Sequence, residues 1–201
     1  MPRPAGTFAR RTIAGVAITT DWTLEQFLAL PETKPALEFW PDGTVTQKMS
    51  PSIEHSLLQL QVGKLLDALQ AGRAMTELRT IFGRSALVPD VAFFVSAELP
   101  VTPRHGWLRY PEWSPTVAVE IASLHQDLDQ LRDKCRFYIE QGSQLALLVL
   151  PEQRRIELFA PSSRQPVRYA AAETMRELVD VLGEAASSIT AEAIFAALRL
   201  E

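Results

Sequence analysis

The stretch that decides the fold reads Thr-Val-Ala-Val-Glu-Ile-Ala at residues 116–122. Five of these seven residues are aliphatic, and a run so continuously apolar is typical of a strand covered on both faces. One charged residue, Glu120, interrupts the run. Because a buried carboxylate is costly unless it is paired or binds a cation, Glu120 is the first candidate for a functional residue.

The sequence on either side of this strand predicts further strands alternating with helices. Thr23 can cap the first helix, an Asp-Gly turn at residues 42–43 joins two short alternating runs, and Gly142 ends the helix that follows residue 126. The expected helices cover 24–30, 51–71, 127–141, 173–182 and 190–198; the expected strands cover 37–40, 44–49, 77–82, 87–95, 116–122, 145–150 and 155–160. We expect residues 155–160 to form an edge hairpin. This order predicts an α/β fold, with a mixed sheet flanked by helices.

The length and composition indicate one globular unit. A chain of 201 residues with 47% hydrophobic residues can bury a sizeable core, so we expect an N-terminal arm at 1–20 and a single domain at 21–201. The last two short helices are expected to be a C-terminal extension of that domain. A single cysteine, Cys135, cannot form an internal disulfide. With no visible secretory signal or membrane span, the expectation is a cytoplasmic protein that does not enter a membrane.

A second carboxylate resembles Glu120 in its setting. Asp90 lies in Val88-Pro89-Asp90-Val91, again within an apolar run. Two carboxylates from adjacent strands make a hard oxygen site suited to Mg²⁺, and the carbonyl of Ile121 can supply a third ligand. The alternative for each acid taken singly is an ordinary buried carboxylate that pairs with an arginine or caps a turn.

Two basic side chains are placed by helical periodicity. Lys134 lies roughly 40° outside the apolar face of its helix, at about 100° per residue, so its ammonium can reach a pocket at the edge of the core. There it can orient an attacking hydroxide or stabilise phosphate charge. The alternative is a solvated lysine that pairs with Gln130 or Asp127. His55 shares a helix face with leucines, which directs it to the core or to a pocket.

The sequence resembles the Uma-two family of candidate restriction endonucleases over roughly residues 20–165. The resemblance rests on the order and spacing of several short motifs. These are Thr23 to Leu28, Leu37-Glu38-Phe39-Trp40 with Asp42-Gly43, Ser50 to His55, Gly83-Arg84 through Pro89-Asp90-Val91, Val119 to Ser123, and Asp133-Lys134 with Tyr138 and Gly142. The family belongs by resemblance to the PD-(D/E)XK nuclease superfamily, which implies a restriction-endonuclease-like core with flanking helices.

The resemblance also implies roles for particular residues. Asp90 and Glu120 would be ligands of Mg²⁺ or Mn²⁺. The superfamily's lysine normally stands two positions after the second acid, where this sequence has Ala122, and Lys134 matches the family's relocated lysine. Glu38 would help hold metal or water, and His55 would contact phosphate or relay a proton. A core histidine bonded to a neighbour is the alternative for His55.

Three functional hypotheses follow. The leading one is a metal-dependent endonuclease that hydrolyses phosphodiester bonds in DNA and acts as a homodimer, although the sequence does not distinguish DNA from RNA. The second is an inactive nuclease-fold module that binds nucleic acid or a protein; a net charge of −4 and the departure from the family's Ser-Pro-Ser at residues 123–125 favour it. The third is a hydrolase of small phosphoesters. Exposed aromatic residues at 100–115, or the C-terminal helices, would form the dimer contact.

Overall fold

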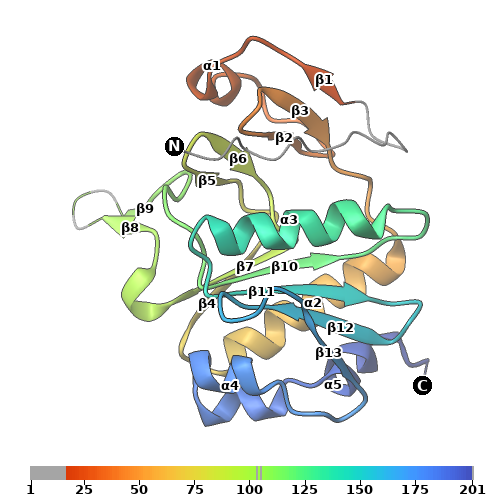
Figure 1. The fold of residues 1–201 in the computed structure, drawn as a ribbon. Coiled ribbons are helices and arrows are strands. Elements are labelled where there is room, and N and C mark those ends of the chain that lie inside the picture. Colours follow the sequence, from red (N-terminus) through yellow and green to blue (C-terminus); the bar gives the residue numbers. More distant parts are fainter. Residues whose placement is uncertain (1–16, 103, 105, 201) are drawn as a thin grey trace.

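The computed structural model describes residues 17–102, 104 and 106–200, and its centre is a six-stranded mixed sheet (Figure 1). The strand order is β13-β12-β11-β10-β7-β4. The strands are β4 (Gly72–Thr76), β7 (Val91–Val95), β10 (Val117–Ile121), β11 (Leu145–Leu150), β12 (Arg155–Phe159) and β13 (Val167–Ala170). Strands β10 and β11 run parallel, whereas the other neighbours in this sheet are antiparallel.

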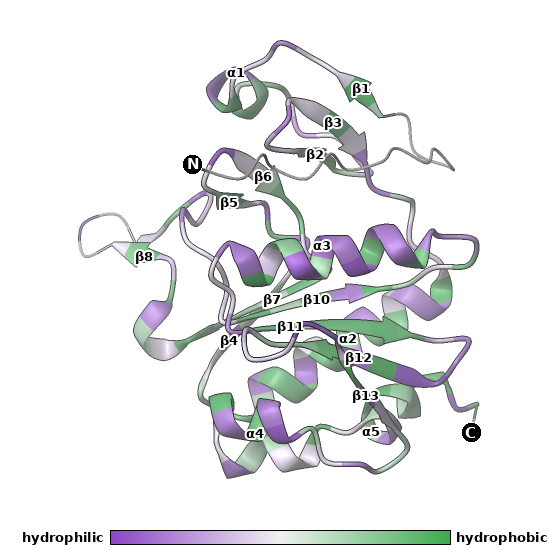
Figure 2. Ribbon diagram, viewed as in Figure 1, coloured by the Kyte–Doolittle hydropathy of each residue, from purple (hydrophilic) through white to green (hydrophobic). Residues whose placement is uncertain are grey.

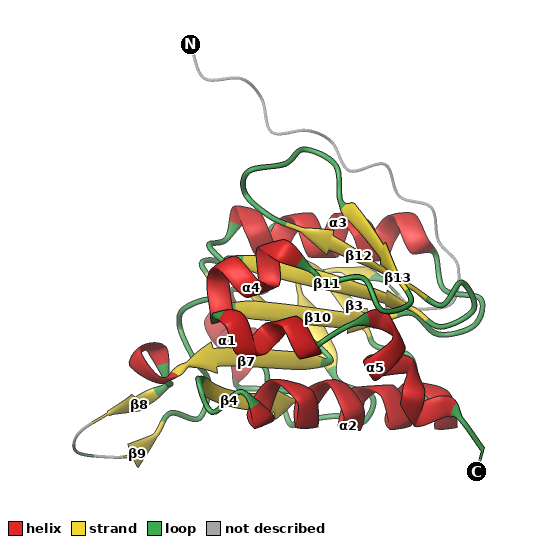
Figure 3. Ribbon diagram, turned by 90° about the horizontal axis from the view of Figure 1, so that it is seen from below, coloured by secondary structure: helices red, strands yellow, loops and turns green. Residues whose placement is uncertain are grey.

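Helices cover both faces of this sheet (Figures 1 and 3). Helix α3 (Leu128–Glu140) lies on one face, and α2 (Ile53–Ala68), α4 (Arg176–Leu182) and α5 (Ala191–Phe195) lie on the other. Successive side chains of a strand point to opposite faces. Val117 and Val119 therefore join the core cluster of α2, α4 and α5, while Ala118 and Ala122 join that of α3. The same alternation directs Glu120 towards α3.

A smaller, five-stranded sheet lies beyond α3, at the top of Figure 1. Its order is β1-β3-β2-β6-β5, from β1 (Ile18–Thr19), β2 (Leu37–Phe39), β3 (Thr44–Gln47), β5 (Thr80–Phe82) and β6 (Ser85–Leu87). Helix α1 (Leu24–Leu28) covers it by stacking Phe27 on Phe39, with ring centroids 5.2 Å apart. The β2–β3 turn needs Gly43, whose φ is +79° and whose added Cβ would lie 2.7 Å from the Thr20 carbonyl oxygen. This sheet matters for the site because β2 carries Glu38.

The remaining elements are short. Strands β8 (Val101–Thr102) and β9 (Gly106–Trp107) form a hairpin that projects from the body (Figure 1). Three 3₁₀ helices cover Ser96–Glu98, Glu184–Ser188 and Ala196–Leu198. No helix in the described part of the chain is long and apolar enough to cross a membrane.

The predicted strands at 77–82 and 87–95 are wrong as continuous elements. The chain leaves the large sheet after β4, forms β5 and β6 in the small sheet, and returns at β7. The first crossing begins at Glu77, whose φ of +52° is left-handed, and the second passes through Pro89, which has no N–H for a ladder bond. The amide of Glu77 donates to the carbonyl of Asp90 across the two crossings (3.2 Å). The junction between the sheets thereby places these two acids side by side.

Other predictions have mixed outcomes. The prediction of a strand covered on both faces at 116–122 is confirmed, since β10 is buried along its length; β11 beside it is also buried, and Figure 2 colours β11 as hydrophobic throughout. The edge assignment for 155–160 is wrong, because β13 pairs outside β12. The predicted arm at 1–20 lies largely outside the described residues, and within it Ile18–Thr19 pairs with β3. The two C-terminal helices lie in the main core cluster through Leu178, Ile194 and Phe195, among others.

Candidate active site

Asp90 immediately precedes β7, and Glu120 lies in β10, the strand that pairs with β7. Val91 of β7 is opposite Val119 of β10, so the next step of the antiparallel register places Asp90 opposite Glu120. Both carboxylates are buried, with exposed fractions of 1% and 2%. The backbone N–H of Ile121 donates to Asp90 Oδ2 at 2.7 Å. The strand pairing thus brings together the two acids that the sequence singles out; metal binding by the Ile121 carbonyl stays a prediction.

Lys134 and Glu38 form the second part of the site. The Nζ atom of Lys134 lies 2.7 Å from Glu38 Oε1 and 3.0 Å from Glu120 Oε1. The hydroxyl of Tyr138, one turn further along α3, also donates to Glu120 Oε1, at 2.7 Å. Glu38 Oε1 in turn accepts the backbone N–H of Val88 at 2.9 Å. A solvated Lys134 is ruled out, because only 6% of the residue is exposed.

Lys48 also belongs to the site, although no sequence pattern predicts it. Its Nζ atom lies 2.5 Å from Asp90 Oδ1, 3.0 Å from Glu77 Oε1 and 2.9 Å from the Val88 carbonyl oxygen. Gln59 of α2 fixes the same region, since its side-chain amide donates to Glu77 Oε1 and to the Asp90 carbonyl. A lysine just after a short strand is usually solvated, so no local signal marks Lys48 or Glu77.

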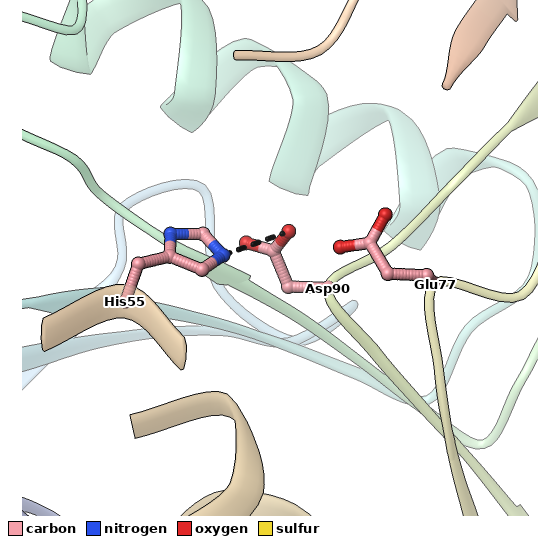
Figure 4. A group of neighbouring side chains, drawn as sticks. All are labelled: His55, Glu77 and Asp90. Carbon is pink, nitrogen blue, oxygen red and sulfur yellow. Dashed lines mark ion pairs between the residues drawn. The ribbon is translucent and has the colours of Figure 1, made fainter. Parts of the chain in front are cut away.

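His55 lies in the first turn of α2, whose N-cap is Ser52. Its Nε2 atom is 3.4 Å from Asp90 Oδ1, and its Nδ1 atom is 3.1 Å from the Ser123 hydroxyl. Figure 4 shows the imidazole and the Glu77 carboxylate on opposite sides of Asp90. One ligand atom of each of these three residues lies within 4.8 Å of the others. His55 therefore has polar partners of its own and contacts the acid at the centre of the site.

The donor atoms of this cluster suit a hard divalent cation. Carboxylate oxygens are the ligands that Mg²⁺ and Mn²⁺ prefer, and imidazole extends the set to other first-row metals. Asp90 belongs to two candidate sets of metal ligands, one with Glu120 and the other with His55 and Glu77. The residues present therefore fit a divalent metal, and Asp90 is the acid around which either arrangement is built.

Burial and charge separate the pKa values of the two central acids. Burial alone would raise the pKa of Asp90, but Lys48 and His55 outweigh it and hold that pKa well below its usual range. Burial raises the pKa of Glu120 to about 7; Lys134 opposes this shift, and the charge of Asp90 adds to it. Burial would lower the pKa of His55, but its hydrogen bond to Asp90 raises it instead. Near neutral pH, Asp90 is ionised while Glu120 is poised to exchange a proton.

We expect Mn²⁺ affinity to rise about tenfold between pH 6 and pH 8, because a bound cation must displace the proton of Glu120. With a pKa of about 7, this carboxyl is mainly protonated at pH 6 and mainly ionised at pH 8. Isothermal titration calorimetry at three pH values, in buffers of different ionisation enthalpy, measures both the affinity and the protons released. Equal affinity at all three pH values would contradict this assignment.

The fold is that of a nuclease-like protein. The structure is similar to a crystal structure from Anabaena variabilis described as "a putative nuclease belonging to DUF820", with a TM-score of 0.80. The alignment covers 89% of this chain and 99% of the other chain at 24% identity, which shows a shared fold. The chain belongs to the Uma2 family, described as "Putative restriction endonuclease", whose profile matches residues 24–192. No curated protein matches the sequence. The resemblance and the fold class drawn from the sequence are thereby confirmed.

Proposed function

We propose that this protein is a metal-dependent endonuclease that hydrolyses phosphodiester bonds in DNA. The observation that carries this proposal is the juxtaposition of two buried acids, Asp90 and Glu120, with the ammonium of Lys134 at 3.0 Å from Glu120. Membership of a family described as "Putative restriction endonuclease" supports it. In this proposal Asp90, Glu120 and the carbonyl of Ile121 hold Mg²⁺ or Mn²⁺.

The chain's own residues would each have a defined task. A bound divalent ion would supply an acidified water and positive charge for the phosphate. Lys134 would donate to the attacking water or to a phosphate oxygen, and Glu38 would hold that ammonium in place from β2. Tyr138 would fix the rotamer of Glu120. His55, oriented by Ser123, would contact phosphate or relay a proton.

The acidic net charge is compatible with this chemistry. A net charge of −4 disfavours tight duplex binding in the absence of metal, because phosphate neutralisation supplies much of the affinity for DNA. A bound cation offsets that repulsion locally. We therefore expect the affinity for DNA to depend on the metal. From the absence of a visible secretory signal in the sequence, we further propose that the protein acts in the cytoplasm.

A homodimer is part of the proposal, because two subunits would present one site to each strand of a duplex. The β8–β9 hairpin is the candidate contact, since Val101 and Trp107 on it are 44% and 58% exposed. The C-terminal helices are a poorer candidate, because their large apolar residues already pack in the core. Light scattering measures the mass, and a monomer at working concentration would contradict this part.

A second function is an inactive module that binds nucleic acid or protein. The departure at Ser123-Leu124-His125 and the acidic charge favour it, whereas the complete set of Asp90, Glu120 and Lys134 favours the enzyme. A hydrolase of small phosphoesters would use the same groups.

The deciding experiment incubates the protein with supercoiled plasmid, single-stranded DNA, RNA and a small chromogenic phosphodiester, each with Mg²⁺, with Mn²⁺ or with EDTA. We expect metal-dependent nicking of DNA that EDTA abolishes. Hydrolysis of the chromogenic compound alone would favour the small-phosphoester reading. Metal and DNA binding without any cleavage, by a folded protein, would favour the binding module.

A further inference from the structure

The ammonium of Lys48 occupies the centre of one half of the site. Its three contacts are to Asp90 Oδ1, Glu77 Oε1 and the Val88 carbonyl, at 2.5, 3.0 and 2.9 Å. An ammonium has three N–H donors, so these three oxygens use all of them. Its side chain is 11% exposed, and that of Glu77 is 45% exposed. A built-in cation thus lies between two of the three residues, His55, Glu77 and Asp90, that have metal-ligand spacing.

The other half of the site is organised differently. Lys134 contacts Glu38 and Glu120 through the same oxygen of each, Oε1, and Tyr138 also donates to Glu120 Oε1. Among the described residues, the hydrogen bonds and ion pairs of the Glu120 carboxylate all involve Oε1, which leaves Oε2 available for a cation. A cation at Asp90 and Glu120 can therefore bind without displacing Lys134, whereas one at Glu77 and Asp90 must displace Lys48.

The charges of the cluster match a single divalent ion. The carboxylates of Glu38, Glu77, Asp90 and Glu120 and the ammonium groups of Lys48 and Lys134 leave two formal negative charges when all carboxylates are ionised and His55 is neutral. One divalent cation neutralises this cluster. A second one, with Lys48 still in place, would leave two buried positive charges, which is costly in a region of low dielectric constant.

We propose that Lys48 is the resident cation of the His55–Glu77–Asp90 half of the site, so that the protein binds one divalent ion, at Asp90 and Glu120, and not two. This inference rests on the proposed metal site. In two-metal nucleases the ions lie about 3.5–4 Å apart and share a carboxylate, which here would be Asp90. Lys48 already lies between Asp90 Oδ1 and Glu77 Oε1, in the position that a second ion would take. Lys48 is thus a positioning residue that sets the metal stoichiometry.

The test is the stoichiometry of Mn²⁺ binding, measured by calorimetry and by electron paramagnetic resonance, at pH 8. We expect one Mn²⁺ for the wild type, two for Lys48→Gln, and one again for Lys48→Gln combined with Glu77→Gln. Lys64→Gln is the matched control, because Lys64 is an exposed lysine on α2. A spin-coupled Mn²⁺ pair should appear in Lys48→Gln alone. Two ions in the wild type, or a single ion in both the wild type and a folded Lys48→Gln variant, would overturn the inference.

A second variant keeps the test decisive if Lys48→Gln does not fold. Glu77→Gln changes a half-exposed side chain and leaves one formal negative charge in the cluster, so we expect it to bind one ion still, with a moderately lower affinity than the wild type. A large loss of affinity in Glu77→Gln, with binding retained in Glu120→Gln, would place the ion where Lys48 lies and overturn the inference. If the wild type binds no ion while Lys48→Gln binds one through Glu77, Lys48 is still the resident cation of its half of the site, and it is the proposed metal site at Asp90 and Glu120 that fails.

Discussion

Replacement of Lys134 by methionine should lower the free energy of unfolding by about 3–5 kcal/mol at pH 8. Lys134 is the ammonium that pairs with Glu38 and Glu120, and all three side chains are at most 7% exposed. Its removal leaves two carboxylates buried without their cation. The loss should be smaller at pH 6. Because the pKa of Glu120 is raised to about 7, this carboxyl is mainly neutral at pH 6 and becomes charged, at a cost in stability, as the pH rises through 7.

Urea unfolding followed by circular dichroism measures this effect. Lys64→Met is the matched control, since it removes an exposed lysine and should change stability by less than about 0.5 kcal/mol. A double variant, Lys134→Met with Glu38→Gln, should recover part of the loss because one unpaired charge is gone. A Lys134→Met protein as stable as the wild type at pH 8 would mean that the buried ion pairs do not form.

Replacement of Glu120 by glutamine should reduce metal-dependent cleavage by more than about 100-fold, because loss of a residue that only orients a metal ligand already costs about 10–100-fold. The amide oxygen can still accept the hydroxyl of Tyr138, so the fold should survive. The measurement is the initial rate on the best substrate at saturating Mg²⁺, with circular dichroism to confirm folding.

Glu157→Gln is the matched control for this second change. Glu157 is also buried, and it lies two strands from Glu120 on the same sheet, with Leu148 between them in register. Its partners are Arg132 and Arg168, outside the site. We expect this variant to lose stability but to keep its cleavage rate. Wild-type cleavage by a folded Glu120→Gln protein would remove Glu120 from the catalytic set.

Local sequence patterns predicted the central residues of the candidate active site. A lone charge in an apolar run marks Glu120, and the same signal marks Asp90, because strand burial makes any charge there conspicuous. Helical periodicity placed Lys134 at the edge of an apolar face, from which it does reach the two carboxylates. The structure brings the predicted residues Glu38, Asp90, Glu120 and Lys134 into one buried cluster, whose role as a metal site stays a prediction.

Lys48 and Glu77 could not be predicted, because their place in the site depends on how the chain crosses between two sheets. Glu77 and Asp90 are neighbours only because the chain leaves the large sheet after β4, forms β5 and β6 in the small sheet, and returns to the large sheet at β7. Lys48 meets them from the end of β3, at a distance of 42 residues in sequence from Asp90. Neither segment that crosses between the sheets has a periodic hydrophobic pattern. The left-handed backbone conformation of Glu77 is also unusual for a glutamate. The positions of Lys48 and Glu77 in the site therefore follow from the tertiary structure and not from local sequence patterns.

Titration of Mn²⁺ into the wild type, Asp90→Asn and Glu120→Gln at pH 8, followed by calorimetry, tests whether these two acids hold a metal. We predict saturable binding by the wild type that each substitution abolishes, with all three proteins folded. Undiminished binding by either variant, or no binding by the folded wild type, would contradict the proposed metal site and the nuclease mechanism built on it.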